Sequence, residues 1–389
     1  MKGILPDRIA IVHDWLITHT GAEKVLEQML NVFPQADLYS IVDLYTPEMR
    51  ALIQNKHAVT SFIQHLPFAR KHFRKYLFLM PLAIEQFDLS PYDLVISSNF
   101  AVAKGILTNP DQLHLCMCYS PIRYAWDLQN QYLKEAGLER GLLSGLVRLM
   151  LHYIRLWDVR TSNGVDAFIA ISNFISRRIW KIYHRDSTVI YPPVNVDYYD
   201  LKSNKEDFFL TVSRFVPYKK INMIVDAFGL MPQKRLIVIG EGADFEKIKA
   251  RASSNVQLLG YQPNEAVRDY LQRAQAFIFA AEEDFGIAPL EAQACGTPVI
   301  AFGKGASLET IQGLDSPMPT GLFFYEQSAV AIAAAVHQFE EVKDRIKPQA
   351  CRENALRFTP EKFRNHFSAF IEDKWKDYCE RMGGQAESG

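Results

Sequence analysis

The stretch QAFIFAAEEDFGIAPLEA, residues 275–292, holds the parts of one α/β unit in order. The apolar run 275–281 predicts a strand, EEDFG a polar turn, and Pro289 the first turn of a helix, where its missing N–H needs no partner. Glu283 then falls at the carboxyl end of the strand and Glu291 in the first helical turn. The loop offers backbone N–H groups to an anion or to sugar hydroxyls. Alternatively, Glu291 complements the helix dipole and Glu283 is solvated.

The same alternation of short apolar runs and longer helical segments continues along the chain. The expected strands are RIAIVHDW, LYSIVD, DLVISSN, LHLCMCYS, AFIAISN and TVIYPPV in the first half, and FFLTVSR, RLIVIGEG, VQLLGY, AFIFAAE, PVIAFG and GLFFY in the second. Such strands, alternating with helices, predict parallel sheets buried on both faces. The proline-containing, charged segment at about 192–207 separates the two halves. We therefore expect an α/β protein with two doubly wound parallel sheets.

Length and composition narrow the class of protein. A chain of 389 residues suffices for two or three domains, and its net charge of −1 does not favour nucleic acid as a partner. No run of eighteen apolar residues predicts a spanning helix, and the N-terminus lacks a signal-peptide pattern. Five cysteines, an odd number, indicate reduced thiols. We expect a cytoplasmic protein.

Charged residues follow other predicted strands too. Arg214 ends FFLTVSR, and Lys219 comes five residues later. An arginine and a lysine at a strand end suit a diphosphate, one as a bidentate donor and one as a point charge, although each also fits a solvated surface. In HDWLITHTGAEKV, His13 and Asp14 end a strand and Gly21 precedes a helix, where backbone approaches a phosphate closely.

Two other chemistries are disfavoured. Gly240 and Gly242 begin a G-x-G-x-x-G pattern, but Phe245 stands at the third glycine, which argues against a nicotinamide enzyme. The chain has no Asp-x-Asp pair to hold a nucleotide diphosphate through a metal, and no Cys/His cluster with zinc spacing. We expect neither a metal nor a resident cofactor.

Together the motifs resemble the GT-B glycosyltransferases of family 4, the retaining, nucleotide-sugar-dependent group. The matching pieces are HDWLITHTGAEKV, CYSPIRYAWD, AISNFISRRIWKIYHRDSTVIYPPVNVD, VSRFVPYKKIN, VIGEG, LLGYQP and EEDFGIAPLEAQACGTPVIAFGKGASLETI. The resemblance implies two Rossmann-like domains facing one cleft. Residues 1–195 would bind the acceptor and 196–365 the donor, and the helix and tail 366–389 would return to the N-terminal domain.

The resemblance also assigns roles to residues. The donor-site positions it implies are Glu283 facing the sugar, Glu291 on the ribose hydroxyls, the amides of Phe285, Gly286 and Ile287 on sugar hydroxyls, Arg214 and Lys219 on the diphosphate, and Gly21 closing over the distal phosphate. Relatives often have a histidine in the sequence C-H-T-P, where this chain has Tyr119. With a pKa near 10, tyrosine is a poor base at neutral pH, but it can donate a hydrogen bond to the sugar. The pattern of the family's mannosyltransferase-like subgroup is matched by His13, Asp14, Arg123 and Asp127. These residues would lie around the acceptor or support the loop.

The implied activity is transfer of a sugar from a nucleotide sugar to a saccharide acceptor in cell-surface or exopolysaccharide synthesis. The pattern SPIRYAWD, residues 120–127, favours mannose from GDP-mannose. One alternative is a GT-B enzyme with a soluble acceptor, such as a sucrose- or trehalose-type synthase. Another is a non-catalytic glycosyltransferase-like subunit that binds a partner, which Tyr119 motivates.

Two basic, apolar segments of the first half suit an anionic membrane surface. They are FIQHLPFARKHFRKYLFLMPLAI, residues 62–84, and GLLSGLVRLMLHYIRLW, residues 141–157. A lipid-linked saccharide acceptor and a peripheral contact with the inner face of the membrane would fit this placement. The same pattern also fits helices that pack on a sheet and leave a basic face in water.

Overall fold

The computed structural model describes residues 5–386, and the chain divides into two compact units. The first unit comprises the chain up to Pro192 and the C-terminal part from Phe363 onward, and the second unit comprises Pro193–Lys362. The boundaries expected from the sequence, 195 and 365, each lie three residues further along (195 against 192, 365 against 362).

Seven parallel strands form the sheet of the first unit, in the order β3-β2-β1-β4-β5-β6-β7. Their bounds are β1 Ile9–His13, β2 Asp37–Ser40, β3 Val59–Thr60, β4 Leu94–Asn99, β5 Leu113–Cys118, β6 Ala167–Ala170 and β7 Ser187–Val189. The strand order reverses between β1 and β4, which pair with Val12 beside Ser97. Ligands of open parallel sheets bind at the carboxyl ends of the strands at such a switch point.

Helices connect these strands. Those of the first unit are α1 Gly21–Val32, α2 Pro47–Ala51, α3 Ala69–His72, α4 Met80–Ile84, α5 Gln129–Glu135, α6 Leu142–Ser162 and α7 Asn173–Tyr183, with the 3-10 turns η1 Phe62–His65, η2 Phe73–Leu79 and η3 Ala103–Gly105. The last helix, α15 (Pro360–Ala386), packs on α1: the rings of Phe33 and Phe367 are 6.1 Å apart, and Arg364 donates to Gln28.

Six parallel strands form the sheet of the second unit, in the order β10-β9-β8-β11-β12-β13. Their bounds are β8 Glu206–Val212, β9 Leu236–Ile239, β10 Val256–Gly260, β11 Ala274–Phe279, β12 Val299–Phe302 and β13 Gly321–Phe324. The helices are α8 Ile221–Gly229, α9 Phe245–Lys249, α10 Asn264–Arg273, α11 Ile287–Ala294, α12 Ser307–Thr310, α13 Ala329–Val342 and α14 Pro348–Ala355, with the 3-10 turns η4 Val196–Tyr198, η5 Pro217–Lys219, η6 Lys343–Arg345 and η7 Leu356–Phe358. Here the order reverses between β8 and β11.

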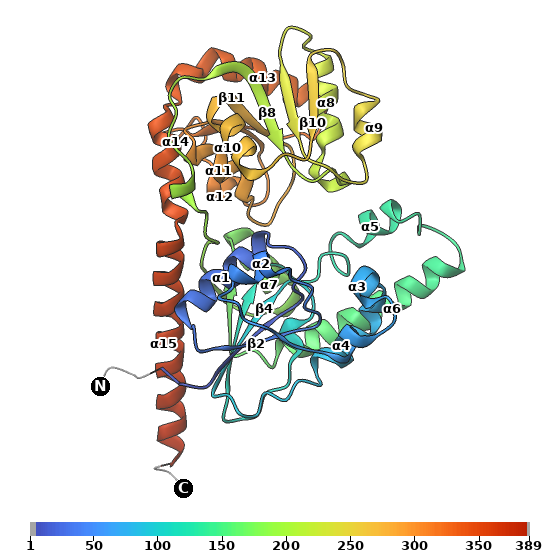
Figure 1. Cartoon of the computed structure of the whole chain (residues 1–389), viewed down its shortest axis with the longest axis vertical. Helices are drawn as coiled ribbons and strands as arrows, with labels where there is room; N and C mark the ends of the chain where they lie inside the picture. The colour runs from blue at the N-terminus through green and yellow to red at the C-terminus, as the bar shows by residue number, and fades with distance from the viewer. Residues whose placement is uncertain (1–4, 387–389) are drawn as a thin grey trace. The chain divides into compact units, whose positions relative to one another are not determined.

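Aromatic side chains join the second sheet to its helices. Phe209 of β8 packs edge-on against Phe228 of α8, with ring centroids 5.4 Å apart, and against Phe339 of α13 at 6.1 Å. All three are essentially buried. Figure 1 shows α8 and α13 beside this sheet. Burying such large rings contributes much of the free energy that holds the layers together.

The expected fold class, two doubly wound parallel sheets, is confirmed. Each apolar run identified in the sequence contains a strand. The strand β3 was missed, because its two residues are too few to show a period. It extends the edge of the sheet beside β2, where Tyr39 pairs with Val59.

Candidate functional site

The loop after β8 carries two cations to the switch point of the second unit. Arg214 is exposed, and its guanidinium donates to the Tyr218 hydroxyl at 3.4 Å. Lys219 ends the short turn η5 five residues further along. Both expected cations therefore lie in one loop at the carboxyl end of a central strand.

Two glycines hold this loop in place. Gly240 has φ +138°, and a Cβ there would lie 1.8 Å from the carbonyl oxygen of Ser213. Gly242 has φ +155°, and a Cβ there would lie 2.4 Å from the carbonyl oxygen of Phe215. Between them, the carbonyl of Glu241 accepts from the Phe215 N–H at 2.7 Å. The partial G-x-G pattern thus serves the close approach of two backbones next to Arg214.

Glu283 follows β11, on the other side of the switch point. Its carboxylate forms an ion pair with the ammonium group of Lys219, and the two side chains are 16% and 17% exposed. Its backbone is fixed by a bridge to Gly305 and by the Ala306 N–H, which donates to the Glu283 carbonyl at 3.0 Å. The structure therefore joins Lys219 and Glu283 into one charged pair across β8 and β11.

The helix α11 begins directly after this loop. Gly286 is its N-cap residue in the left-handed region, φ +84°, and no side chain caps the helix. The first N–H groups of a helix have no acceptor within it, so the start of α11, from Ile287, favours negative charge or hydroxyl groups. Phe285 is buried, with its ring 5.7 Å from that of Phe358. Its side chain therefore serves packing, and its backbone remains the group expected to meet a ligand.

Glu291 lies one turn further into α11 than expected. The helix begins at Ile287, so Glu291 is its fifth residue, and the first turn holds no acidic side chain. The expectation that Glu291 lies in the first turn, and the helix-dipole role based on it, are wrong. Instead, Glu291 faces Tyr199: burial raises the pKa of the Tyr199 hydroxyl, and the charge of Glu291 and a hydrogen bond to it raise that pKa further. Tyr199 thereby orients the carboxylate.

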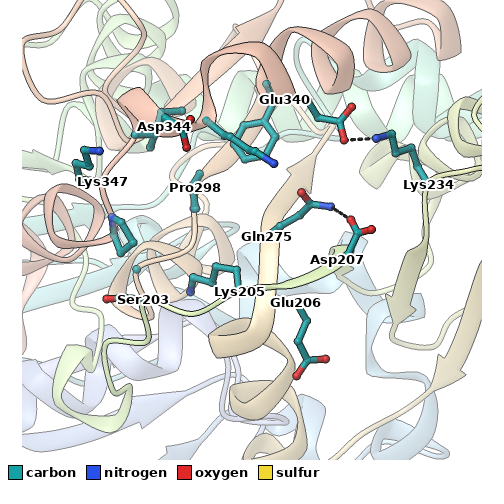
Figure 2. Close-up of a pocket in the computed structure, with 15 residues that line it drawn as sticks. Ser203, Lys205, Glu206, Asp207, Lys234, Gln275, Pro298, Glu340, Asp344 and Lys347 are labelled. Atoms are coloured by element: carbon teal, nitrogen blue, oxygen red, sulfur yellow. Dashed lines mark hydrogen bonds and ion pairs between the residues drawn. The ribbon is translucent and has the colours of Figure 1, made fainter.

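A polar cavity of about 540 Å³ lies at the opposite edge of the same sheet. It is lined by residues at the amino ends of β8 and β11, among them Lys205 and Gln275 (Figure 2). Lys205 donates to three oxygens, and burial lowers its pKa to about 8. Lys234 pairs with Glu340 there. Both lysines already have partners within the unit, and the cavity lies away from the strand carboxyl ends, so we do not assign the site to this cavity.

In the first unit, Asp14 crosses the corresponding switch point. It follows β1, is fully buried, and accepts hydrogen bonds from four consecutive N–H groups after β4, those of residues 100–103, at 2.5 to 2.8 Å. Burial raises the pKa of Asp14, and these N–H bonds oppose that rise. Of the two roles left open by the sequence, contact with an acceptor or support of the loop, the geometry favours support of the loop.

A buried hydrogen-bonded chain joins His13 to Tyr119. The Tyr119 hydroxyl donates to the carbonyl of Ala22 at 3.1 Å and lies 2.9 Å from the hydroxyl of Ser98, which lies 2.9 Å from Nδ1 of His13. Burial raises the pKa of Tyr119 beyond its usual range, so its hydroxyl stays neutral. The donor proton of Tyr119 is thus committed to the start of α1, where Gly21 is the first residue.

Glu23 completes the start of α1. Its carboxylate accepts from the backbone N–H of Thr20 at 3.1 Å and lies 3.9 Å from Nε2 of His13. Burial alone would raise the pKa of Glu23, but the nearby His13 ring and the hydrogen bonds at Thr20 lower it overall. The spacing Thr-x-x-Glu is a helix-start signal. The sequence of residues 20–23 therefore already indicated the hydrogen bond between Thr20 and Glu23.

Of the two remaining acceptor-side residues, Asp127 is held by α7. Arg178 donates to the Ser120 hydroxyl at 2.8 Å and forms an ion pair with Asp127. Arg123 lies half-buried between them in the sequence, and its carbonyl accepts from the N–H of Leu128. Sequence reasoning missed Arg178, because its spacing within a helix resembles any solvated cation. The structure thus joins Ser120 and Asp127 through one arginine.

Residues 5–386 offer neither a cluster of metal ligands nor a membrane-spanning helix. In that range no group of three or more His, Cys, Asp or Glu side chains is arranged to hold a metal ion. Nor is any helix of that range long and apolar enough to cross a membrane.

Both halves of the chain match family models. Residues 20–198 match "Glycosyltransferase Family 4", and residues 200–358 match "Glycosyl transferases group 1". The uncharacterized glycosyltransferase YqgM of Bacillus subtilis is 25% identical over 236 residues, 55% of this chain and 65% of YqgM. A GDP-mannose-dependent monoacylated alpha-(1-6)-phosphatidylinositol monomannoside mannosyltransferase of Corynebacterium glutamicum is 32% identical over 114 residues, 25% of this chain and 30% of that protein. The chain thus spans less than two thirds of the length of each of these relatives.

A solved structure shares the fold. HepE of Anabaena, in complex with UDP-glucose, superimposes with a TM-score of 0.66 at 14% identity, covering 94% of this chain and all of HepE. At this identity the likeness shows the fold alone. Two parallel-sheet units of the GT-B kind, each matched by a glycosyltransferase model, show that the chain belongs to family 4 of the glycosyltransferases.

Proposed function

We propose that this protein is a retaining glycosyltransferase that moves a sugar from a nucleotide sugar to a saccharide acceptor. The observation that carries the proposal is the charged pair of Lys219 and Glu283 across the switch point, with the exposed Arg214 in the same loop. A diphosphate needs cations, and a sugar needs hydrogen-bond acceptors. This edge of the sheet supplies both, beside the uncapped start of α11.

The chemistry follows from charge. When a nucleoside diphosphate leaves, negative charge grows on the phosphate oxygens and positive charge on the anomeric carbon. Arg214 and Lys219 stabilise the phosphate charge, and such fixed charges act strongly because they need no reorganisation. Lys219 turns from Glu283 to the phosphate, which frees the Glu283 carboxylate to accept from a sugar hydroxyl. The leaving phosphate takes the acceptor proton, so no dedicated base is needed.

The other donor contacts come from α11 and α1. The backbone N–H groups of Phe285, Gly286 and Ile287 donate to sugar hydroxyls, and Glu291, oriented by Tyr199, accepts from the ribose hydroxyls. Gly21 lets the start of α1 approach the distal phosphate. No metal or other cofactor takes part, because Arg214 and Lys219 supply two positive charges. A chelator should therefore leave nucleotide binding unchanged.

We further propose GDP-mannose as the donor and a lipid-linked saccharide as the acceptor, in cell-surface or exopolysaccharide synthesis on the cytoplasmic side of the membrane. Residues 120–127 and the printed name of the Corynebacterium relative support this choice. The basic, apolar segments 62–84 and 141–157 support a lipid-linked acceptor. The neighbour with UDP-glucose makes a uridine donor the first alternative to test.

The test is a thermal-shift panel with GDP, UDP, ADP and their common sugar conjugates. A ligand at about a hundred times its Kd adds about 2.7 kcal/mol to stability. We expect a shift with one nucleotide that is lost in Arg214→Ala and kept in Lys304→Ala, a cation whose partner is Glu282 at 3.1 Å. No shift with any nucleotide, in a folded protein, would refute the transferase and favour a non-catalytic subunit.

A further inference from the structure

One face of α6 is apolar and uncovered in the first unit. Leu142, Leu146, Leu149, Tyr153 and Leu156 are each between 59% and 97% exposed. Their spacing of four, three, four and three residues places them on a single stripe of the helix. A single exposed leucine is ordinary, but a continuous apolar row on a protein surface marks a site of interaction.

The opposite face of α6 is packed on the unit and brings η2 beside it. Leu151 and Ile154 are buried in a cluster, and the partly buried Leu77 of η2 packs against it. The next residue, Phe78, is 56% exposed. Figure 1 shows α6 beside α3 and α4, which flank η2. We call the exposed set, Leu142, Leu146, Leu149, Tyr153, Leu156 and Phe78, the α6 surface.

The charge around the α6 surface is positive. Residues 61–84 and 142–157 contain no Asp or Glu. The exposed basic residues of these two segments are Arg70, Lys71, Arg74, Lys75 and Arg148. The acidic residues that directly follow the two segments are already paired, Glu85 with Arg160 and Asp158 with Lys104. The apolar stripe thus belongs to segments that carry exposed cations and no carboxylate of their own.

We propose that the α6 surface docks on an anionic lipid bilayer. Amphipathic helices with an apolar stripe and flanking Lys and Arg lie in the interface plane, where their apolar side chains enter the acyl boundary and the cations meet anionic headgroups. A second copy of this chain fits less well, because pairing two such surfaces would bring like charges together. A neutral apolar partner would leave the cations without a counterpart.

The docked helix would also hold the loop of residues 120–129. The ring N–H of Trp126 donates to Asp158 of α6 at 2.7 Å, and Arg155 of α6 donates to the carbonyl of Ala125 at 2.9 Å. The expected acceptor residues Arg123 and Asp127 lie in this loop. Docking would thus bring the loop to the lipid surface. This placement of the acceptor rests on the proposed function, whereas the docking itself does not.

The test is flotation with vesicles of phosphatidylcholine, with or without phosphatidylglycerol, at low and high salt. We expect the protein to float with anionic vesicles and the bound fraction to fall with salt. The variant Leu146→Glu/Leu149→Glu should lower the vesicle affinity by at least about tenfold, since it puts two charges into the stripe. Arg70→Gln/Lys71→Gln/Lys75→Gln should lower it by about tenfold or more on anionic vesicles only.

The matched control is Leu230→Glu/Val330→Glu, two leucine- or valine-to-glutamate changes at exposed positions of the second unit, 59% and 69% exposed. It should float like the wild type. If the α6 variant also floats like the wild type, or if the control falls equally, the proposal is wrong. Wild type that does not float but self-associates, with the α6 variant monomeric, would assign the surface to a second copy and overturn docking. The nucleotide thermal shift of each variant, read without vesicles, separates a failure of docking from a failure of the proposed transferase.

Discussion

The two units share one topology and use the switch point of their sheets differently. In the first unit, the carboxylate of Asp14 crosses from β1 to the N–H groups that follow β4, and it is fully buried. In the second unit, the carboxylate of Glu283 crosses from β11 to Lys219 after β8, and both side chains keep some exposure. One crossing joins a side chain to backbone, and the other joins two side chains.

This difference separates groups that hold the fold from groups that can meet a ligand. The four N–H groups bonded to Asp14 cannot be released without leaving buried donors unsatisfied, which costs free energy. The lysine of the second unit can turn to another anion at little cost, because its ammonium group is flexible and partly hydrated. A strand-end position therefore predicts nearness to a switch point, and partners and burial decide what the residue does there.

The largest expected effect is on the fold of the first unit. Asp14→Ala leaves four N–H groups without their acceptor, and we expect a loss of about 4 kcal/mol in the free energy of unfolding. Urea unfolding measures it, with Asp7→Ala, an exposed carboxylate, as the control that stays within about 0.5 kcal/mol of wild type. A loss as small as that of the control would show that the buried crossing is dispensable.

The second expected effect is on chemistry, with stability nearly unchanged. Lys219→Ala removes a cation from the diphosphate position, so the rate of nucleoside diphosphate release from the nucleotide sugar should fall about a hundredfold or more, about 3 kcal/mol. Lys304→Ala, which removes the 61%-exposed partner of Glu282 on the same edge, is the control and should leave the rate unchanged. Equal rates in the two variants would contradict the assignment of the site to this loop.

The third expected effect is acid sensitivity of the first unit. Burial lowers the pKa of His114 to about 4, although its bond to the Gly164 carbonyl and the charge of Asp166 oppose this. Because the folded chain then binds fewer protons than the unfolded chain between about pH 4 and about pH 6.5, stability falls as the pH drops through that window, by on the order of 3 kcal/mol.

Urea unfolding of wild type and His114→Gln at about pH 7 and about pH 5 measures this effect. The advantage of wild type over the variant should shrink at the lower pH. Parallel losses in both proteins would show that another group carries the acid sensitivity.

The fold and the positions of the strand ends could be predicted from local sequence patterns. Every long strand was visible as an apolar run, and the strand ends of Arg214 and Glu283 followed from it. The partners of Asp14 and Tyr119 were not visible, because Ser98 and Ala22 contribute single atoms from far along the chain. No spacing rule reports such contacts. The position of Glu291 could not be predicted because a proline does not mark the first helical residue uniquely. Pro289 lies in the third position of α11, which places Glu291 beyond the first turn.

The smallest expected effect decides what Tyr119 does. Its hydroxyl is bonded to Ala22 and Ser98, so Tyr119→Phe should cost about 1 kcal/mol of stability. Tyr124→Phe is the matched control, since the Tyr124 hydroxyl is buried without a hydrogen-bond partner among the described residues and its loss should cost nothing. If Tyr119 only positions the start of α1, the release of nucleoside diphosphate should slow less than about tenfold, about 1.4 kcal/mol. A larger fall in rate with unchanged stability would instead make Tyr119 a contact of the donor sugar. The switch point of the first unit would then also carry a ligand contact, as we propose for that of the second unit.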